Sequence, residues 1–217
     1  MGDQGVLTAR LRSLYEKISA PTPERRSIIP DLVEEFVRLY SQPHRHYHTL
    51  RHISECLQEF DEVSLACSNH LASEMAIWYH DIIYEPSGDV NERLSANKAN
   101  FDCIRLGVMH KSFADNVAHI IMATKHASVV QGDAAIVMDA DLAILGSSSE
   151  RFAEYEGQIR KEHGHLSDHD YATGRTLVLD GFMRRPIIYA TDYFKDKYEK
   201  TARANIAMSL MKLTRAG

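Results

Sequence analysis

Apolar residues recur every three or four positions through most of the chain, which is the spacing of one face of an α-helix. In the first such run Leu7, Leu11 and Leu14 follow one another at these steps. Patterns of this kind predict helices over residues 7–18, 32–40, 49–60, 70–83, 91–106, 113–121, 136–145, 152–159, 176–183 and 195–213.

The ends of several predicted helices carry recognisable signals. Gly107 follows the fifth helix at the position that favours a left-handed backbone. Ser147 and Glu150 have the spacing of a capping box, and Asp168 is suited to cap a later helix. Residues 136–145 could begin as a buried strand, but their alanines and leucines favour a helix. Because no alternating strand pattern or internal boundary is visible, we expect a single all-α domain over residues 1–217 with nine or ten helices.

Composition excludes several classes of protein. The 217 residues carry a net charge of -5 and are 44% hydrophobic, which is typical of a soluble domain and argues against general binding to nucleic acids or anionic membranes. Three widely spaced cysteines exclude a disulfide scaffold. The amino terminus lacks an apolar signal region, and no apolar run is long enough for a membrane helix. We therefore expect a cytoplasmic protein.

Twelve histidines are an unusual number for this length, and some of them stand with acids in helical segments. His48 and His52 lie four residues apart, so they share a helix face. The pair His80 and Asp81 closes an apolar run, and further acids and imidazoles occur at residues 123–126 and 138–142. Burial of an unpaired carboxylate is costly, and a bound cation removes this cost. Imidazole and carboxylate without thiolate suit Mn²⁺, Fe²⁺, Zn²⁺, Co²⁺ or Mg²⁺.

The ordered motifs resemble those of the HD-domain superfamily of metal-dependent phosphohydrolases, in particular a subgroup of small predicted phosphohydrolases. The resemblance spans nearly the whole chain. It rests on R-x-Y-H-x-x-x-H at residues 45–52, W-Y-H-D-I-I-Y at 78–84, N-E-x-x-S-A at 91–96, A-T-K-H at 123–126, D-A-D-L-A-I-L-G at 139–146 and E-x-x-A-R-x-N at 199–205.

The resemblance implies an HD-type helical bundle with one divalent metal ion. It assigns as metal ligands His52, His80, Asp81 and Asp141. Asp139 is the rival of Asp141, which we prefer because the last acid of the family directly precedes an apolar helical turn. Glu92 corresponds to a catalytic acid in related hydrolases. We expect the phosphate of a small substrate, such as a nucleotide, to contact Arg45, His48, Lys125 and His126.

Three functions follow from this resemblance. The first is hydrolysis of a phosphomonoester by water that the metal activates. The second is a di-iron oxygenase, which needs a second metal ion held by extra histidines such as His110, His119 and His126. The third is a binding module that retains a metal without catalysis. We favour one metal ion and hydrolysis.

Other polar residues have simpler explanations. His44 and His46 are expected in a loop or pocket wall, and the histidines of residues 163–169 in a solvated turn. Glu199, Arg203 and Asn205 lie at helical spacing and suit a structural ion pair. Trp78 and the tyrosines are expected in the core, although Tyr84 could stack on a base.

Overall fold

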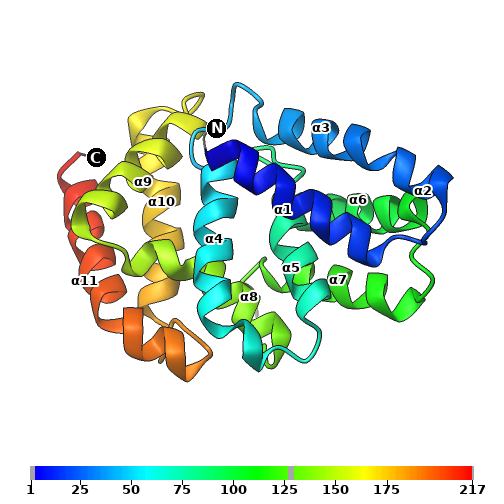
Figure 1. The fold of residues 1–217 in the computed structure, drawn as a ribbon. Helices are drawn as coiled ribbons and strands as arrows, with labels where there is room; N and C mark the ends of the chain where they lie inside the picture. Colours follow the sequence, from blue (N-terminus) through cyan, green and yellow to red (C-terminus); the bar gives the residue numbers. More distant parts are fainter. Residues whose placement is uncertain (1–2, 127–129, 217) are drawn as a thin grey trace. The chain divides into compact units, whose positions relative to one another are not determined.

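The computed structural model describes residues 3–126 and 130–216, and these residues form helices without a strand (Figure 1). Within the described ranges, ten of the eleven α-helices have at least ten residues, which confirms the all-α prediction. In chain order the elements are α1 (Asp3–Ile18), α2 (Pro23–Ser27), α3 (Ile29–Tyr40), α4 (Leu50–Val63), the 3₁₀ turn η1 (Ser64–Ala66), α5 (His70–Tyr79), α6 (Asn91–Leu106), α7 (Lys111–Ala123), α8 (Asp133–Leu142), the 3₁₀ turn η2 (Ala143–Gly146), α9 (Ser149–Glu162), α10 (Asp168–Met183) and α11 (Asp192–Ala216).

The chain divides into two compact units, residues 1–138 and 139–217. The boundary falls inside α8 rather than in a linker, so composition gives no signal for it. At the start of α8, Asp133 accepts hydrogen bonds from the backbone N–H groups of Ser68 and Asn69 at 2.8 Å each. The expected single domain over residues 1–217 stays a prediction.

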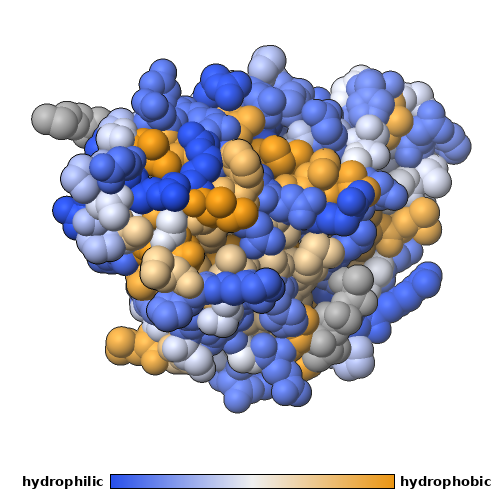
Figure 2. Space-filling view, turned by 90° about the vertical axis from the view of Figure 1, so that its right-hand side faces the viewer, coloured by the Kyte–Doolittle hydropathy of each residue, from blue (hydrophilic) through white to orange (hydrophobic). Residues whose placement is uncertain are grey.

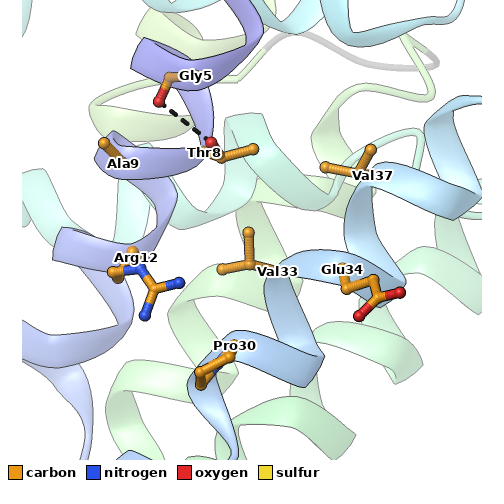
Figure 3. A pocket seen from close by; sticks show the side chains of 8 residues that line it. All are labelled: Gly5, Thr8, Ala9, Arg12, Pro30, Val33, Glu34 and Val37. Carbon is orange, nitrogen blue, oxygen red and sulfur yellow. Dashed lines mark hydrogen bonds between the residues drawn. The ribbon is translucent and has the colours of Figure 1, made fainter.

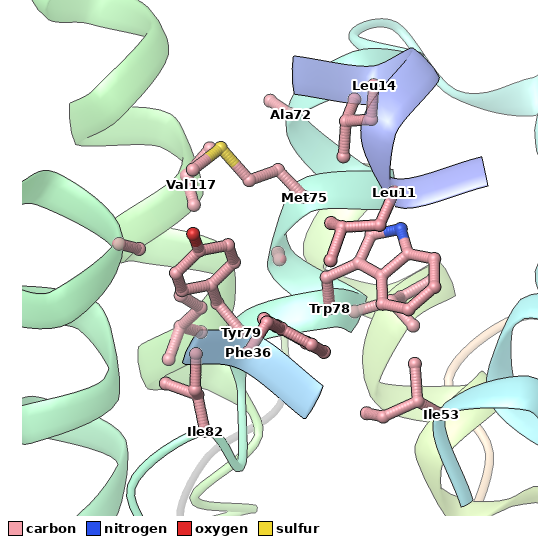
Figure 4. Packing of buried hydrophobic residues seen from close by; sticks show 14 of the residues in the cluster. Leu11, Leu14, Phe36, Ile53, Ala72, Met75, Trp78, Tyr79, Ile82 and Val117 are labelled. Atoms are coloured by element: carbon pink, nitrogen blue, oxygen red, sulfur yellow. The ribbon is translucent and has the colours of Figure 1, made fainter. Parts of the chain in front are cut away.

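The centre of the first unit is α5, which is buried on all sides. Residues 72–79 are all buried, and a helix without a solvent face has no amphipathic stripe. Trp78 and Phe36 pack edge to face with ring centroids 5.5 Å apart, and Leu11 and Ile53 also point into this cluster (Figure 4). The core therefore fixes the helix that ends at the His80–Asp81 pair.

Two predicted helix caps are displaced by one residue. Ser148 rather than Ser147 caps α9, since its side chain accepts a hydrogen bond from the N–H of Arg151. Ser167 rather than Asp168 caps α10, because its hydroxyl accepts from the N–H of Asp170. Gly107 has the predicted left-handed backbone, with a φ of 68°.

The face shown in Figure 2 carries many hydrophilic side chains and, among them, a gathering of apolar ones. None of the helices in residues 3–126 and 130–216 is both long and apolar enough to cross a membrane. A hollow of about 390 Å³ lies between α1 and α3 (Figure 3). Its lining is mainly apolar or small, so it contains no group of metal ligands.

The residues of the E-x-x-A-R-x-N motif make several contacts within the second unit. The carboxylate of Glu199 accepts from the N–H of Ile188 at 2.9 Å and pairs with Arg203 at 2.7 Å, which confirms the predicted ion pair. The amide nitrogen of Asn205 donates to the carbonyls of Leu145 and Ser147 at 2.9 and 3.0 Å. These contacts give the E-x-x-A-R-x-N motif a structural role.

Close packing explains why position 146 is a glycine. Its place after an apolar run would also suit a helix cap, but a cap does not account for it. A Cβ added at Gly146 would lie 2.5 Å from the Cβ of Tyr198 on α11, which is closer than real contacts allow. Since φ of Gly146 is not positive, the glycine is required by space and not by backbone conformation.

We expect Gly146→Ala to lower the free energy of unfolding by about 1–3 kcal/mol, because the added methyl group overpacks this contact. Gly157, inside α9, has nothing within 4 Å of an added Cβ. Gly157→Ala is therefore the matched control and should raise stability by about 0.5–1 kcal/mol. Chemical denaturation followed by circular dichroism measures both, and equal stability of the two variants would contradict the packing argument.

Candidate metal centre

His80 stands directly after α5, in a conformation that fixes its tautomer. Its N–H donates to the carbonyl of Ala76 at 2.9 Å, as in a last helical turn. The ring atom Nδ1 lies 2.8 Å from the carbonyl oxygen of Ile77. Because a carbonyl only accepts, Nδ1 carries the proton, and the neutral ring has its lone pair at Nε2. Metal-binding histidines are commonly oriented in this way.

The side chains of His52 and Asp81 both lie close to the Nε2 atom of His80. The Nε2 atoms of His52 and His80 lie 3.0 Å apart. The Asp81 Oδ2 atom is 3.0 Å from Nε2 of His80 and 3.5 Å from Nε2 of His52. Both imidazoles are almost completely buried, with 1–2% of the side chain exposed, whereas 17% of the Asp81 side chain is exposed. The α4 helix and the end of α5 thus bring three metal-ligating atoms together.

The spacing of these three atoms fits a single divalent ion. Ligand atoms bound at about 2.1 Å lie about 3.0 Å apart at right angles and about 3.4 Å apart at a tetrahedral angle. Two of the observed distances, 3.0 and 3.0 Å, equal the lower of these values, and the third, 3.5 Å, is slightly longer than the upper one. Two nitrogens and one carboxylate oxygen form a donor set suited to Mn²⁺, Fe²⁺, Co²⁺ or Zn²⁺. This part of the first unit could therefore hold a metal ion.

Electrostatics keep Asp81 in the form that binds a cation. Burial raises the pKa of this carboxyl group, but the protonated forms of His80 and His48, through their charges, and hydrogen bonds from protonated His52 and His80 lower it. The lowering effects dominate, and the pKa lies well below its ordinary value. The carboxylate is therefore ionised throughout the neutral range.

The two rival acids of the D-A-D motif both belong to the second unit. Asp139 is fully buried and accepts hydrogen bonds from the N–H groups of Ala190 and Thr191 at 2.9 and 2.7 Å, and from the Thr191 hydroxyl at 2.8 Å. These contacts give Asp139 a structural role at the start of α11. Asp141 is half-buried near the end of α8, and its part in the site stays a prediction from the sequence.

The guanidinium group of Arg45 donates hydrogen bonds to backbone carbonyl groups. Its Nη1 atom donates to the carbonyls of His48 and Asp81 at 3.0 and 2.8 Å, and Nη2 donates to the carbonyl of Ile82 at 2.9 Å. The residue is 5% exposed, and its charge also lies 4.9 Å from the ring centre of Tyr40. The geometry thus favours a positioning role over the predicted phosphate contact.

His48 lies beside the three candidate ligands, but it stands in the turn before α4 and not, as its spacing predicted, on a helix face shared with His52. Its Nε2 atom is 3.9 Å from Oδ2 of Asp81. Its ring stacks on Tyr84 with centroids 4.0 Å apart. Because His48 covers a face of the Tyr84 ring and this tyrosine is only 8% exposed, we do not retain the idea that Tyr84 stacks on a base.

The remaining predicted site residues lie in the first unit. Glu92 is half-buried in the first turn of α6. The Nζ atom of Lys125 donates to the carbonyl of Asp89 at 2.9 Å. His126 follows α7 with a φ of 54°, a left-handed conformation that is uncommon for a residue other than glycine. Their roles toward a substrate stay predictions.

The histidines invoked for a second metal ion do not form a second group. His110 and His119 are exposed. In residues 3–126 and 130–216, no cluster of three or more potential ligands includes either of them, His126 or the histidines of residues 163–169. The geometry therefore favours the one-metal alternative, and the solvated character predicted for His165 and His169 agrees with their exposure.

Sequence reasoning assigned no role to Asn91 and Ser95, although both contact the chain just beyond Asp81. The side chain of Asn91 bonds to both the N–H and the carbonyl of Glu85, and the hydroxyl of Ser95 bonds to both groups of Ile83. Their spacing of four residues in N-E-x-x-S-A was the available signal, because it places them on one helix face.

The arrangement can therefore present two neutral imidazole nitrogens and one ionised carboxylate to a cation. Comparison with known proteins adds no assignment: no family model matches the chain, and no curated protein or solved structure matches it either.

Proposed function

We propose that the chain is a metal-dependent phosphohydrolase of the HD type that cleaves a phosphomonoester of a nucleotide or a similar small molecule. The observation that carries this proposal is the convergence of the two Nε2 atoms of His52 and His80 with the carboxylate of Asp81, at 3.0–3.5 Å from one another. Asp141 is the fourth ligand that the sequence predicts. The ordered motifs at residues 45–52, 78–84 and 91–96 support the same assignment.

In this proposal, different residues would hold the metal ion, donate a proton and bind the phosphate. A divalent cation held by this group supplies Lewis acidity, which activates water as a nucleophile and polarises a phosphoryl oxygen. The bond from His80 Nδ1 to the Ile77 carbonyl keeps the ring proton away from the metal side. Glu92 is our candidate for the acid that protonates the leaving oxygen. His48, Lys125 and His126 are the candidates for binding the phosphate.

The test is phosphate release from a panel of nucleotides by protein reconstituted with Mn²⁺. We expect Asp81→Ala to lose both the metal and the activity, because one of the three converging ligands is removed. Asp89→Ala is the control, since Asp89 is exposed and contacts Lys125 through its backbone carbonyl only. Undiminished activity of Asp81→Ala would overturn the proposal.

Metal analysis and oxygen consumption, measured beside phosphate release, separate the alternatives. A binding module would take up Mn²⁺ and retain a phosphate ligand without turnover of any substrate. A di-iron oxygenase would contain two irons per chain and consume oxygen. Replacement of Glu92 by glutamine should lower turnover while leaving the metal bound, and unchanged turnover would remove Glu92 from the role of proton donor.

A further inference from the structure

The five residues that follow His80 form an irregular segment, 81–85, that carries the ligand Asp81. Their carbonyl groups cannot form a helical ladder, yet each accepts a hydrogen bond from a side chain of another element. Four residues supply these donors, and we call their side chains the clamp: His44, Arg45, Asn91 and Ser95.

One side of the clamp comes from the loop before α4. Arg45 donates to the carbonyls of Asp81 and Ile82, as described above. The Nε2 atom of His44 lies 3.0 Å from the carbonyl oxygen of Tyr84 and must be its donor.

The other side comes from the first two turns of α6. The Ser95 hydroxyl accepts from the N–H of Ile83 at 3.1 Å and donates to the carbonyl of the same residue at 3.3 Å. The Asn91 amide accepts from the N–H of Glu85 at 3.2 Å and donates to its carbonyl at 2.9 Å. Ser95 is fully buried and Asn91 is 9% exposed, so water does not replace these bonds at low cost.

The clamp is closely packed. A Cβ added at Gly88 would lie 2.6 Å from Oδ1 of Asn91, so this glycine leaves room for the amide. Regular secondary structure normally satisfies buried backbone groups. Here side chains from two separate parts of the first unit do so, and every carbonyl of the segment that begins with Asp81 is bound by one of them.

We infer that the clamp sets the position of the Asp81 carboxylate and thereby the affinity of the metal centre, so that its members are positioning residues. This inference rests on the proposed function, because it requires that Asp81 binds the metal. Partners that orient metal ligands typically contribute about 10–100-fold to metal affinity. None of the four needs to touch the ion or the substrate for this effect.

The experiment measures Mn²⁺ binding by calorimetry and the spectrum of bound Mn²⁺ by electron paramagnetic resonance. We expect Ser95→Ala, Asn91→Ala and Arg45→Lys each to weaken binding by about tenfold or more and to alter the spectrum, since Asp81 can then adopt several positions. If Arg45→Lys does not fold, the other two variants carry the test.

Two controls separate positioning from a general loss of stability. Ser73 is fully buried and its hydroxyl donates to the carbonyl of Asn69 at the opposite end of α5, so Ser73→Ala matches Ser95→Ala. Arg203 donates to the carbonyls of Met183, Arg185 and Pro186 in the second unit, so Arg203→Lys matches Arg45→Lys. Both controls should bind Mn²⁺ like the parent protein.

The outcomes distinguish the two proposals. If the parent protein binds Mn²⁺ and the clamp variants bind it with the same affinity and spectrum, the inference fails while the proposed function stands. If the controls weaken binding as much as the clamp variants do, the effect is one of stability and the inference fails again. A parent protein without affinity for Mn²⁺ overturns the proposed function and the inference together.

Discussion

Replacing His80 with alanine should lower the affinity for Mn²⁺ by at least about a hundredfold, which exceeds the loss expected for a residue that only orients a ligand. The Nε2 atom of His80 is the one closest to both other ligand atoms, at 3.0 Å from each. Without this imidazole, His52 and Asp81 stay 3.5 Å apart and only two of the three ligands in the first unit remain. Calorimetric titration of metal-stripped protein measures the change.

His119→Ala is the control for this variant, and it also decides between one metal ion and two. His119 is exposed on α7, so its loss should leave both the affinity and a stoichiometry of one ion per chain unchanged. A stoichiometry near two that falls in His119→Ala would restore the two-metal alternative. Full affinity in His80→Ala would remove His80 from the site.

Helical periodicity predicted the architecture because many helices of this chain, unlike α5, have one buried and one exposed face. The range of α6 agrees with the predicted residues 91–106, and its end at Gly107 was visible as a local signal. The end of α5 was not predictable in the same way, since the pattern continued to residue 83 and the helix stops at Tyr79. The carbonyls of Ile77 and Trp78, which would accept the next helical N–H groups, accept instead from the His80 ring at 2.8 Å and from the Tyr40 hydroxyl at 2.9 Å.

The candidate ligands in the first unit could be predicted because the ordered motifs resemble those of the HD-domain superfamily. The resemblance assigned His52, His80 and Asp81 as ligands, whereas the cost of burying an unpaired carboxylate only indicated that a bound cation would be favourable in such segments. The role of Arg45 could not be found in this way. A guanidinium group can bind a phosphate or a set of backbone carbonyls equally well. Which of these Arg45 binds depends on Asp81 and Ile82, which lie 36 and 37 residues further along the chain.

Replacing Asp102 with alanine should cause the largest loss of stability, because this carboxylate is the centre of a buried network in the first unit. Asp102 is 1% exposed. It accepts from the hydroxyl of Tyr79 at 2.9 Å and pairs with Lys98 at 2.8 Å and Arg105 at 3.3 Å. The Tyr15 and Tyr79 hydroxyl oxygens lie 2.6 Å apart, which extends the network into the core. Burial raises the pKa of Tyr79 well above its ordinary value, so its hydroxyl keeps the proton that it donates.

We expect Asp102→Ala to lower the free energy of unfolding by about 3 kcal/mol, at the lower end of the cost of breaking a buried ion pair. The lower end applies because Lys98 and Arg105 keep Glu35 as a partner, at 3.0 and 2.9 Å. Trp78 is the single tryptophan of the chain and is fully buried in the same unit, so its fluorescence during urea denaturation reports this transition. Asp115→Ala removes only an exposed pair with Lys111 and should change the midpoint very little. Similar midpoints for the two variants would mean that the tyrosines and cations around Asp102 find other partners at no cost, and that the network does not hold α5 in place.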